Sequence, residues 1–232
     1  MARNGRCAEC ADRNKYLFCS MDAEELRKLE SLGTAVRYDR GATIYREGYR
    51  CESVYVLCSG RVKLWTANES GRTLILKVAS AGQVLGLTAA LSGHPHEVTA
   101  EAIEACRVRA IQREQFVAFL DGNREAALRA AKLICNEYIA ALTEMRRVAL
   151  PSSASARVAN LLLDWTREEG RETGGQRQCN LPLTHEEIAS MAATSRETVT
   201  RVLGRLRRDR LIRLQGASLT VLEPRALERL AE

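Results

Sequence analysis

The spacing of apolar residues changes once along this chain, near Gln112, and that change limits the folds available to it. From about Thr34 to Val108, apolar and polar residues alternate in short runs separated by glycines. Alternation with a period of two buries one face of a short strand, so this stretch predicts an all-β sandwich or barrel. Beyond Gln112 apolar residues recur every three or four positions, which predicts helices. The expected fold class is therefore α+β.

A heptad pattern marks one long helix, expected over residues 123–150, with Asn123 as its N-cap and Pro151 after its end. Its apolar seam is Leu128, Ala131, Cys135, Tyr138, Leu142 and Met145. Such a seam packs either against its own domain or against the same helix of a second chain. The length of the helix and its place between two candidate domains favour dimerisation at least as much as internal packing.

Composition sets the broad class of the protein. The 232 residues suffice for two domains, and 46% hydrophobic with 28% charged residues is ordinary for a globular protein. The apolar runs are far shorter than the ~20 residues of a membrane-spanning helix. The first residues lack the apolar core of a secretion signal. We therefore expect a cytoplasmic protein with no membrane contact, whose thiols stay reduced.

Positive charge is concentrated in one short segment. The formal net charge of the chain is +6, and residues 196–213 contain seven arginines against only Glu197 and Asp209. A local positive stripe suits a polyphosphate partner, although an arginine-rich solvated helix face would look the same by charge alone.

Residues 183–222 predict a helix-turn-helix followed by a two-stranded wing. Thr184 and Glu187 form a capping box for a short helix, and Ser195 caps a second helix after a tight turn. Residues 211–214 and 219–222 then predict strands on either side of a turn at 215–218. A short helix, a turn and a second helix with polar side chains in its first turns are typical of double-stranded DNA binding.

The polar side of the second helix carries the candidate base-contacting residues Arg196, Glu197, Thr200 and Arg201. Arginine can donate two hydrogen bonds to guanine, and a carboxylate can accept one from cytosine. The candidate phosphate contacts are Thr184, Ser195 and Arg208.

The segments Leu183–Ala189 and Ser195–Leu203 resemble the winged helix-turn-helix of the CRP/FNR family of bacterial transcription regulators. Gly41, Gly48 and the run 54–62 are similar to that family's cyclic-nucleotide-binding β-roll. The resemblance implies four parts: an N-terminal cysteine-containing segment (1–22), a β-roll sensor domain (23–122), a dimerisation helix (123–150) and a winged helix-turn-helix domain (151–232). It also implies a homodimer on palindromic DNA, with half-sites roughly 34 Å apart, and RNA polymerase as a partner.

The same resemblance implies which bases are contacted. Family members with Arg-Glu-x-x-x-Arg at this place bind a TGTGA-like half-site, and Arg196, Glu197 and Arg201 fit that pattern. Glu197 and Arg201 would contact its TGA core. Thr200 departs from the glycine often found with this pattern.

The resemblance also bears on the signal. The family's cAMP pocket uses a glutamate and an arginine–serine pair, where this chain has Leu87 and His96-Glu97. A carboxylate repels a phosphate. We therefore expect an effector or a redox signal other than cAMP.

Cys7, Cys10 and Cys19, with Cys106 as the nearest fourth candidate, resemble the cluster-binding cysteines of the oxygen-sensing FNR branch, which hold a [4Fe-4S] cluster. Thiolates suit iron–sulfur clusters or zinc. This chain departs from that branch in two ways: its third spacing is longer, and Arg109 aligns with the fourth ligand. Related family members keep Cys-x2-Cys-x2-Arg-x4-Leu-Phe without a cluster, so a structural or redox-active thiol site is the alternative.

A thiol redox enzyme is the rival class of function. The Cys-x2-Cys pair lacks the βαβ context that a dithiol redox motif needs. The sequence also has no Ser/His/Asp set, paired carboxylates or phosphate-binding loop. We therefore expect a regulator and not an enzyme.

Overall fold

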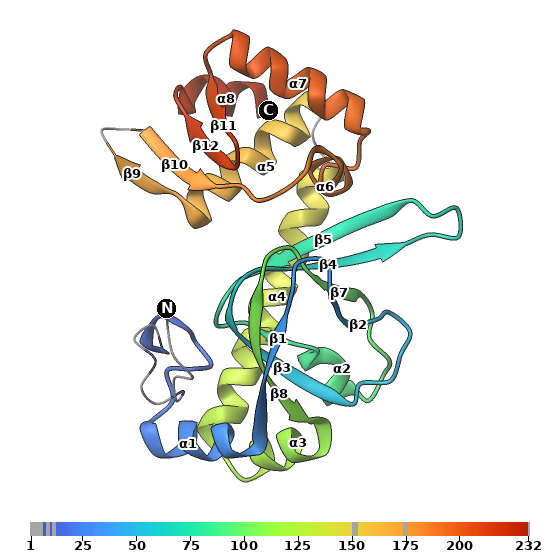
Figure 1. The fold of residues 1–232 in the computed structure, drawn as a ribbon, viewed down its shortest axis with the longest axis vertical. Helices are drawn as coiled ribbons and strands as arrows, with labels where there is room; N and C mark the ends of the chain where they lie inside the picture. The colour runs from blue at the N-terminus through green and yellow to red at the C-terminus, as the bar shows by residue number, and fades with distance from the viewer. Residues whose placement is uncertain (1–6, 8–9, 11–12, 150–152, 174–175, 232) are drawn as a thin grey trace. The chain divides into compact units, whose positions relative to one another are not determined.

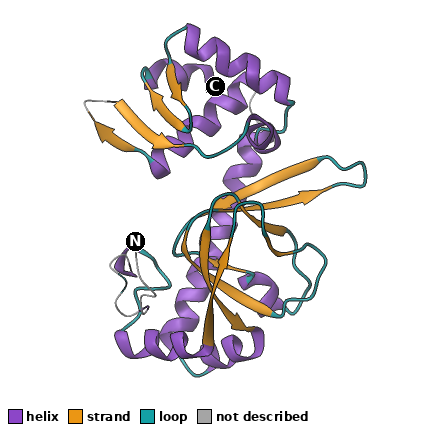
Figure 2. Ribbon diagram, in the orientation of Figure 1, coloured by secondary structure: helices purple, strands orange, loops and turns teal. Residues whose placement is uncertain are grey.

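The computed structural model describes residues 7, 10, 13–149, 153–173 and 176–231, so the predicted helix stop at Pro151 lies outside the described residues. The chain divides into two compact units: residues 1–66 with 76–140, and residues 67–75 with 141–232. Figure 1 labels the helices and strands, and Figure 2 colours them by type.

The first unit contains short strands, as the alternating pattern predicts, and they form the β-roll that the resemblance implies. Its eight strands are β1 (Gly33–Tyr38), β2 (Thr43–Tyr45), β3 (Ser53–Ser59), β4 (Val62–Ala67), β5 (Thr73–Ala79), β6 (Val84–Leu85), β7 (Thr99–Ala102) and β8 (Cys106–Gln112). They form two four-stranded sheets, in the orders β1-β8-β3-β6 and β2-β7-β4-β5. Gly71 closes the β4–β5 turn with a φ of 79°, a left-handed conformation that glycine adopts without steric cost.

The first sheet contributes buried side chains on both of its faces. Toward the second sheet it contributes Leu57 and Val108 to the core of the roll. Toward the helices it contributes Val54, Val56 and Ile111 to a second core. Because side chains alternate along a strand, neighbouring residues of β3 and β8 enter different cores.

Four helices accompany the roll: α1 (Ala23–Leu32), α2 (Leu87–Ser92), α3 (Arg113–Asp121) and α4 (Arg124–Ala149). Phe116, Phe119 and Leu120 of α3 join Leu26 and Leu29 of α1 in the second core, and Figure 1 shows these two helices close together. A 3-10 turn at Arg13–Lys15 precedes them.

The second unit contains α5 (Ala154–Glu169), α6 (His185–Met191), α7 (Arg196–Arg208) and α8 (Pro224–Ala231). Its sheet has the order β11-β12-β10-β9, with β9 at Arg171–Thr173, β10 at Gln176–Asn180, β11 at Ile212–Gln215 and β12 at Ser218–Val221. The predicted wing strands are confirmed as β11 and β12 within one residue. The sequence analysis did not predict β9 and β10.

The start of α4 depends on a buried cap. Asn123 is 9% exposed, and its Oδ1 accepts a hydrogen bond of 2.8 Å from the amide of Ala126. Its Nδ2 donates to the carboxylate of Glu25 on α1. The predicted N-cap is confirmed, and it also joins two helices.

We expect Asn123→Ala to lower the free energy of unfolding by about 1–2 kcal/mol, because it removes the cap and leaves Glu25 without this donor. Asn136→Ala is the matched control, since Asn136 is exposed on the same helix. Urea denaturation followed by circular dichroism measures both variants. Equal stabilities for the two variants would contradict this role for the cap.

Candidate nucleic-acid interface and sensor sites

Two capped helices form the candidate DNA-binding motif. The hydroxyl of Thr184 accepts from the amide of Glu187 at 3.2 Å, and the Glu187 carboxylate accepts from the Thr184 amide at 2.9 Å. Ser195 accepts from the amide of Thr198 at 3.2 Å at the start of α7. Both predicted caps are therefore present. They satisfy amides that a helix N-terminus leaves without partners.

A side chain of a third helix, α5, forms hydrogen bonds to the turn between α6 and α7. Ala193 has a φ of 46°, a left-handed conformation that costs a non-glycine residue roughly 1 kcal/mol or more. Arg157 of α5 donates to the carbonyl of Ala192 at 2.8 Å and to that of Ala193 at 3.4 Å. The sequence analysis missed Arg157, because its partners lie 35 residues further along the chain.

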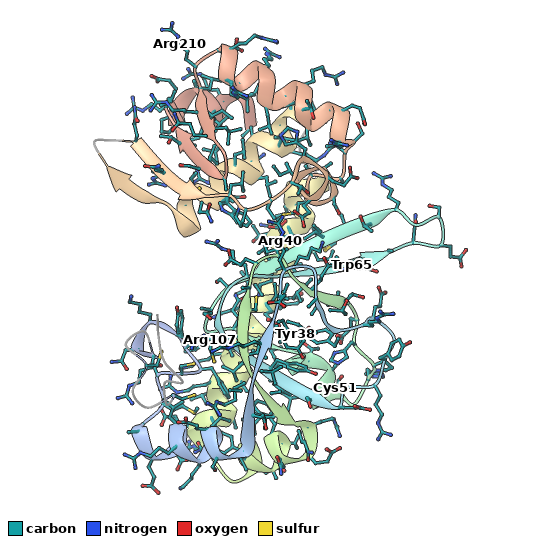
Figure 3. All side chains as sticks on the ribbon, in the orientation of Figure 1. Tyr38, Arg40, Cys51, Trp65, Arg107 and Arg210 are labelled. Atoms are coloured by element: carbon teal, nitrogen blue, oxygen red, sulfur yellow. The ribbon has the colours of Figure 1, made fainter. Side chains whose placement is uncertain are left out.

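One face of α7 is apolar and the other is charged. Its buried side chains are Val199, Val202, Leu203 and Leu206. The side chains exposed on this helix include all the predicted base-contacting residues, Arg196, Glu197, Thr200 and Arg201, as well as Arg208. Beyond the helix, Arg210 points away from the domain (Figure 3).

The charges on this face are available to a ligand. Within the described residues, neither Arg201 nor Arg208 takes part in an ion pair, whereas Arg205 lies 3.5 Å from Asp209. Hydrogen bonds from its own backbone amide and from the Ser195 hydroxyl lower the pKa of Glu197, so its carboxylate is ionised at neutral pH. An ionised carboxylate accepts hydrogen bonds and donates none.

Thr200 has internal partners for its hydroxyl. Its Oγ1 donates to the Arg196 carbonyl at 2.9 Å and lies 2.9 Å from Nδ1 of His185 on α6. A hydroxyl has one proton, so His185 is the donor in this pair when Thr200 donates to Arg196. The sequence analysis did not identify His185, which stands at the exposed start of α6 and links the two helices.

An aromatic stack lies beside Gly86, the glycine that precedes α2. His96 is 4% exposed, and its ring stacks on that of Tyr45 with a centroid distance of 3.9 Å and an interplanar angle of 13°. A Cβ on Gly86 would meet the His96 ring at 3.1 Å, and Gly86 itself has a φ of 76°. Next to it, Leu87 is 2% exposed in the second core. Leu87 and the stacked His96 therefore place buried apolar and aromatic groups around Gly86.

The cysteines lie on different faces of the first sheet. Cys106 belongs to the core of the roll, and its thiol lies 3.2 Å from the carbonyl oxygens of Arg61 and Glu104, to either of which it can donate its one proton. Cys7 and Cys19 pack against the second core, on the opposite face. The structure therefore places Cys106 and the N-terminal cysteines on opposite faces of this sheet. Side chains alternate between the two faces along a strand, and the Cys106 side chain takes the face of the roll.

The seam of α4 is exposed along its whole length. Its members, Leu128, Ala131, Cys135, Tyr138, Leu142 and Met145, are all exposed, and Tyr138 and Met145 retain 66% and 67% of their accessible surface. The opposite side of the helix is buried at Ala126 and Ala130. The chain therefore leaves an apolar stripe uncovered on a helix that is anchored by its other face.

Two family models match this chain. A cyclic nucleotide-binding domain matches residues 35–123 and a Crp-like helix-turn-helix domain matches residues 156–230. The nitrogen fixation regulation protein FixK of Bradyrhizobium diazoefficiens is 30% identical over 97% of this chain and 93% of its own length. This chain belongs to the CRP/FNR family of transcription regulators.

Other family members agree with this assignment. The fumarate and nitrate reduction regulatory protein of Escherichia coli is 24% identical over 97% of this chain and 90% of its own length. The solved structure of FixK2 from Bradyrhizobium japonicum has a TM-score of 0.76 and 25% identity, and covers 86% of this chain and 98% of that protein. The β-roll, long helix and helix-turn-helix are thus the family's fold, and the family consists of DNA-binding regulators. None of the helices in the described ranges has the length and apolarity to cross a bilayer.

We expect acid to destabilise the sensor domain through His96. Burial lowers the pKa of His96, while the nearby Glu97 opposes that shift. Below about pH 6.5 the unfolded state takes up the proton first, so the free energy of unfolding falls as the pH falls. His96→Phe should flatten this dependence between about pH 6.5 and 5.

His94→Phe is the matched control, because His94 is exposed two residues away. Urea denaturation at several pH values measures the slope for each variant. A wild-type slope in His96→Phe would show that His96 does not titrate differently on unfolding.

Proposed function

We propose that this CRP/FNR regulator acts in the cytoplasm as a homodimer that binds a palindromic, TGTGA-like DNA site. The observation that carries the proposal is the exposed face of α7. Arg196, Glu197 and Arg201 project from that face together, on a helix whose opposite side is buried. In a helix-turn-helix protein this second helix enters the major groove.

The contacts follow from the chemistry of each side chain. Arg196 and Arg201 each present a planar fork that can donate two hydrogen bonds to guanine O6 and N7. The ionised carboxylate of Glu197 accepts from cytosine N4. Thr200 lies on the same face. Its hydroxyl can contact a base once it gives up its hydrogen bond with His185 or with the Arg196 carbonyl.

Phosphate contacts come from the edges of the same surface. Thr184 and Ser195 stand at the two helix starts, where backbone amides and the helix dipole favour an anion. Arg208, in the last turn of α7, is exposed without an ion-pair partner among the described residues. These contacts set affinity and orientation, whereas the base contacts set sequence preference.

The exposed seam of α4 is the proposed dimer interface. Knobs-into-holes packing of two such seams would cover the apolar surface of Leu142, Tyr138 and Met145. A two-fold dimer places two α7 helices on two half-sites, roughly 34 Å apart, which explains the need for a palindrome. Contact with RNA polymerase, which the family implies, belongs to the same proposal.

The signal in this proposal is an effector or a redox change other than cAMP. Leu87 is buried in the core beside the turn where the family's pocket has a glutamate. His96 is stacked on Tyr45, and Glu97 follows it with a negative charge. Neither residue supplies a cation for a cyclic phosphate.

We expect Arg201→Ala to weaken binding to a TGTGA palindrome by about 10–100-fold, since a bidentate base contact discriminates by about 1–3 kcal/mol. Glu197→Ala should have an effect of the same order. Arg201→Ala should not lose thermal stability, because its side chain is exposed. Electrophoretic mobility shift on the palindrome and on a scrambled duplex measures the preference.

The matched control for Arg201→Ala is Arg225→Ala, which removes the same charge from the exposed surface of α8. Arg225→Ala should keep the preference for the palindrome. An Arg201→Ala protein that still prefers the palindrome as wild type does would overturn the assignment of the α7 face.

Leu142→Glu tests the seam. We expect this variant to be monomeric, because a charge at the centre of an apolar interface is left without water or a partner. Asn136→Glu is the control, since Asn136 is exposed on α4 but lies outside the seam. Sedimentation equilibrium measures both masses, and a dimeric Leu142→Glu protein would remove the seam from the interface.

A further inference from the structure

Arg210, just beyond the end of α7, has a backbone conformation that favours glycine. Its φ is 55°, in the left-handed region. The amide of Arg210 donates to the carbonyl of Arg207 at 3.1 Å, and the amide of Leu211 donates to that of Leu206 at 2.9 Å. These two hydrogen bonds form a Schellman motif, in which the left-handed residue is usually glycine. The unusual feature of this helix end is therefore the arginine side chain.

The backbone on both sides of Arg210 fixes this conformation. Before it, Leu206 is 1% exposed. After it, the carbonyl of Leu211 accepts hydrogen bonds from the amides of Leu222 at 2.9 Å and Glu223 at 3.3 Å, beyond the wing. A right-handed Arg210 would break the bonds of the motif, so an arginine here carries a steric cost that glycine would avoid. Strained residues of this kind are concentrated at functional sites.

The charge of Arg210 is not compensated within the protein. Its side chain is exposed, has no ion-pair partner among the described residues and points away from the domain (Figure 3). Residues 207–213 contain four arginines and a single acid, Asp209, which already lies 3.5 Å from Arg205. Like charges at this density repel one another, so the segment favours a polyanion as its partner.

The helix dipole does not account for this arginine. Cations are stabilised beside the last carbonyls of a helix, but the effect falls off beyond the last turn. Arg207 and Arg208 already occupy that turn. Arg210 follows it, with its side chain directed into solvent.

The length of α7 brings this helix end to the DNA backbone. The helix has 13 residues and is therefore about 20 Å long, whereas the major groove is about 12 Å wide. In a helix-turn-helix protein the N-terminal residues of the second helix contact the bases. With its first turns against the bases, the C-terminal end of α7 reaches the phosphates at the edge of the groove.

We propose that Arg210 binds a DNA phosphate, and that this contact is the reason for an arginine at a position that favours glycine. The inference rests on the proposed function and adds to it a residue that the sequence analysis did not identify. A guanidinium can donate two parallel hydrogen bonds to a phosphate. Such a contact raises the affinity for any duplex and leaves sequence preference unchanged.

The experiment measures binding of the full chain to the TGTGA palindrome and to a scrambled duplex, from about 50 to 200 mM salt. Each phosphate contact adds about 0.9 to the steepness with which log K falls against log salt. Arg210→Gly should lower that steepness by about 0.9 per chain, or about 1.8 for a dimer. Over this range its affinity should therefore fall roughly tenfold less than that of wild type. Its preference for the palindrome should not change.

Two further variants separate the guanidinium contact from charge in general. Arg210→Lys keeps a cation on the same strained backbone and should keep the wild-type steepness. Arg225→Ala removes one exposed cation from α8 and should also keep it. Thermal melting should find Arg210→Gly at least as stable as wild type, because glycine adopts a φ of 55° without steric cost.

Arg210→Gly with wild-type steepness would overturn the proposal and leave this cation to another partner, such as an acidic protein surface. The same loss of steepness in Arg225→Ala would overturn it too, since any missing charge would then suffice. A lower melting temperature for Arg210→Gly would assign the arginine to the helix end itself. The proposed function is tested separately by the palindrome preference of Arg201→Ala, which depends on bases and not on phosphates.

Discussion

The burial of one side of α7 determines that the charged side chains on its other side face the solvent. Val199, Val202, Leu203 and Leu206 are each at most 5% exposed, and burying such a side chain is worth about 1.5–3 kcal/mol. Turning the helix about its axis would expose these side chains and bury arginines without partners. The buried apolar side therefore fixes the rotation of α7 about its axis, and with it the direction in which the polar side chains point. Arg157 holds the turn from which the helix starts. Recognition of DNA in this protein rests first on hydrophobic packing.

The first sheet of the roll also has two different environments, one on each of its faces. One face is closed by the second sheet, and the other is covered by helices and the N-terminal segment. A single step along a strand moves a side chain from one to the other. Val56 and Leu57 show the consequence, since they are adjacent on β3 and enter different cores.

Much of this could be predicted from the sequence because the determining interactions are local. The caps of α6 and α7, the apolar side of α7 and the heptads of α4 all depend on residues within a few positions of one another. His185 and Arg157 could not be identified in this way. Their partners are 15 to 36 residues away in the chain.

The long helix α4 contacts the N-terminal segment on one side and carries the exposed apolar seam on another. Its buried side uses Ala126 and Ala130, whose small side chains let the helix lie close to the second core. From the same helix Arg129 donates to the carbonyls of Leu17 and Ser20, at 2.6 and 3.2 Å, directly beside Cys19. The apolar seam begins at the adjacent Leu128. A rearrangement of the segment around Cys19 would therefore act first on the part of α4 that carries Arg129. Arg129 is next to Leu128, the first residue of the apolar seam. The contacts of the N-terminal segment with α4 and the start of the exposed seam thus lie at neighbouring positions of one helix.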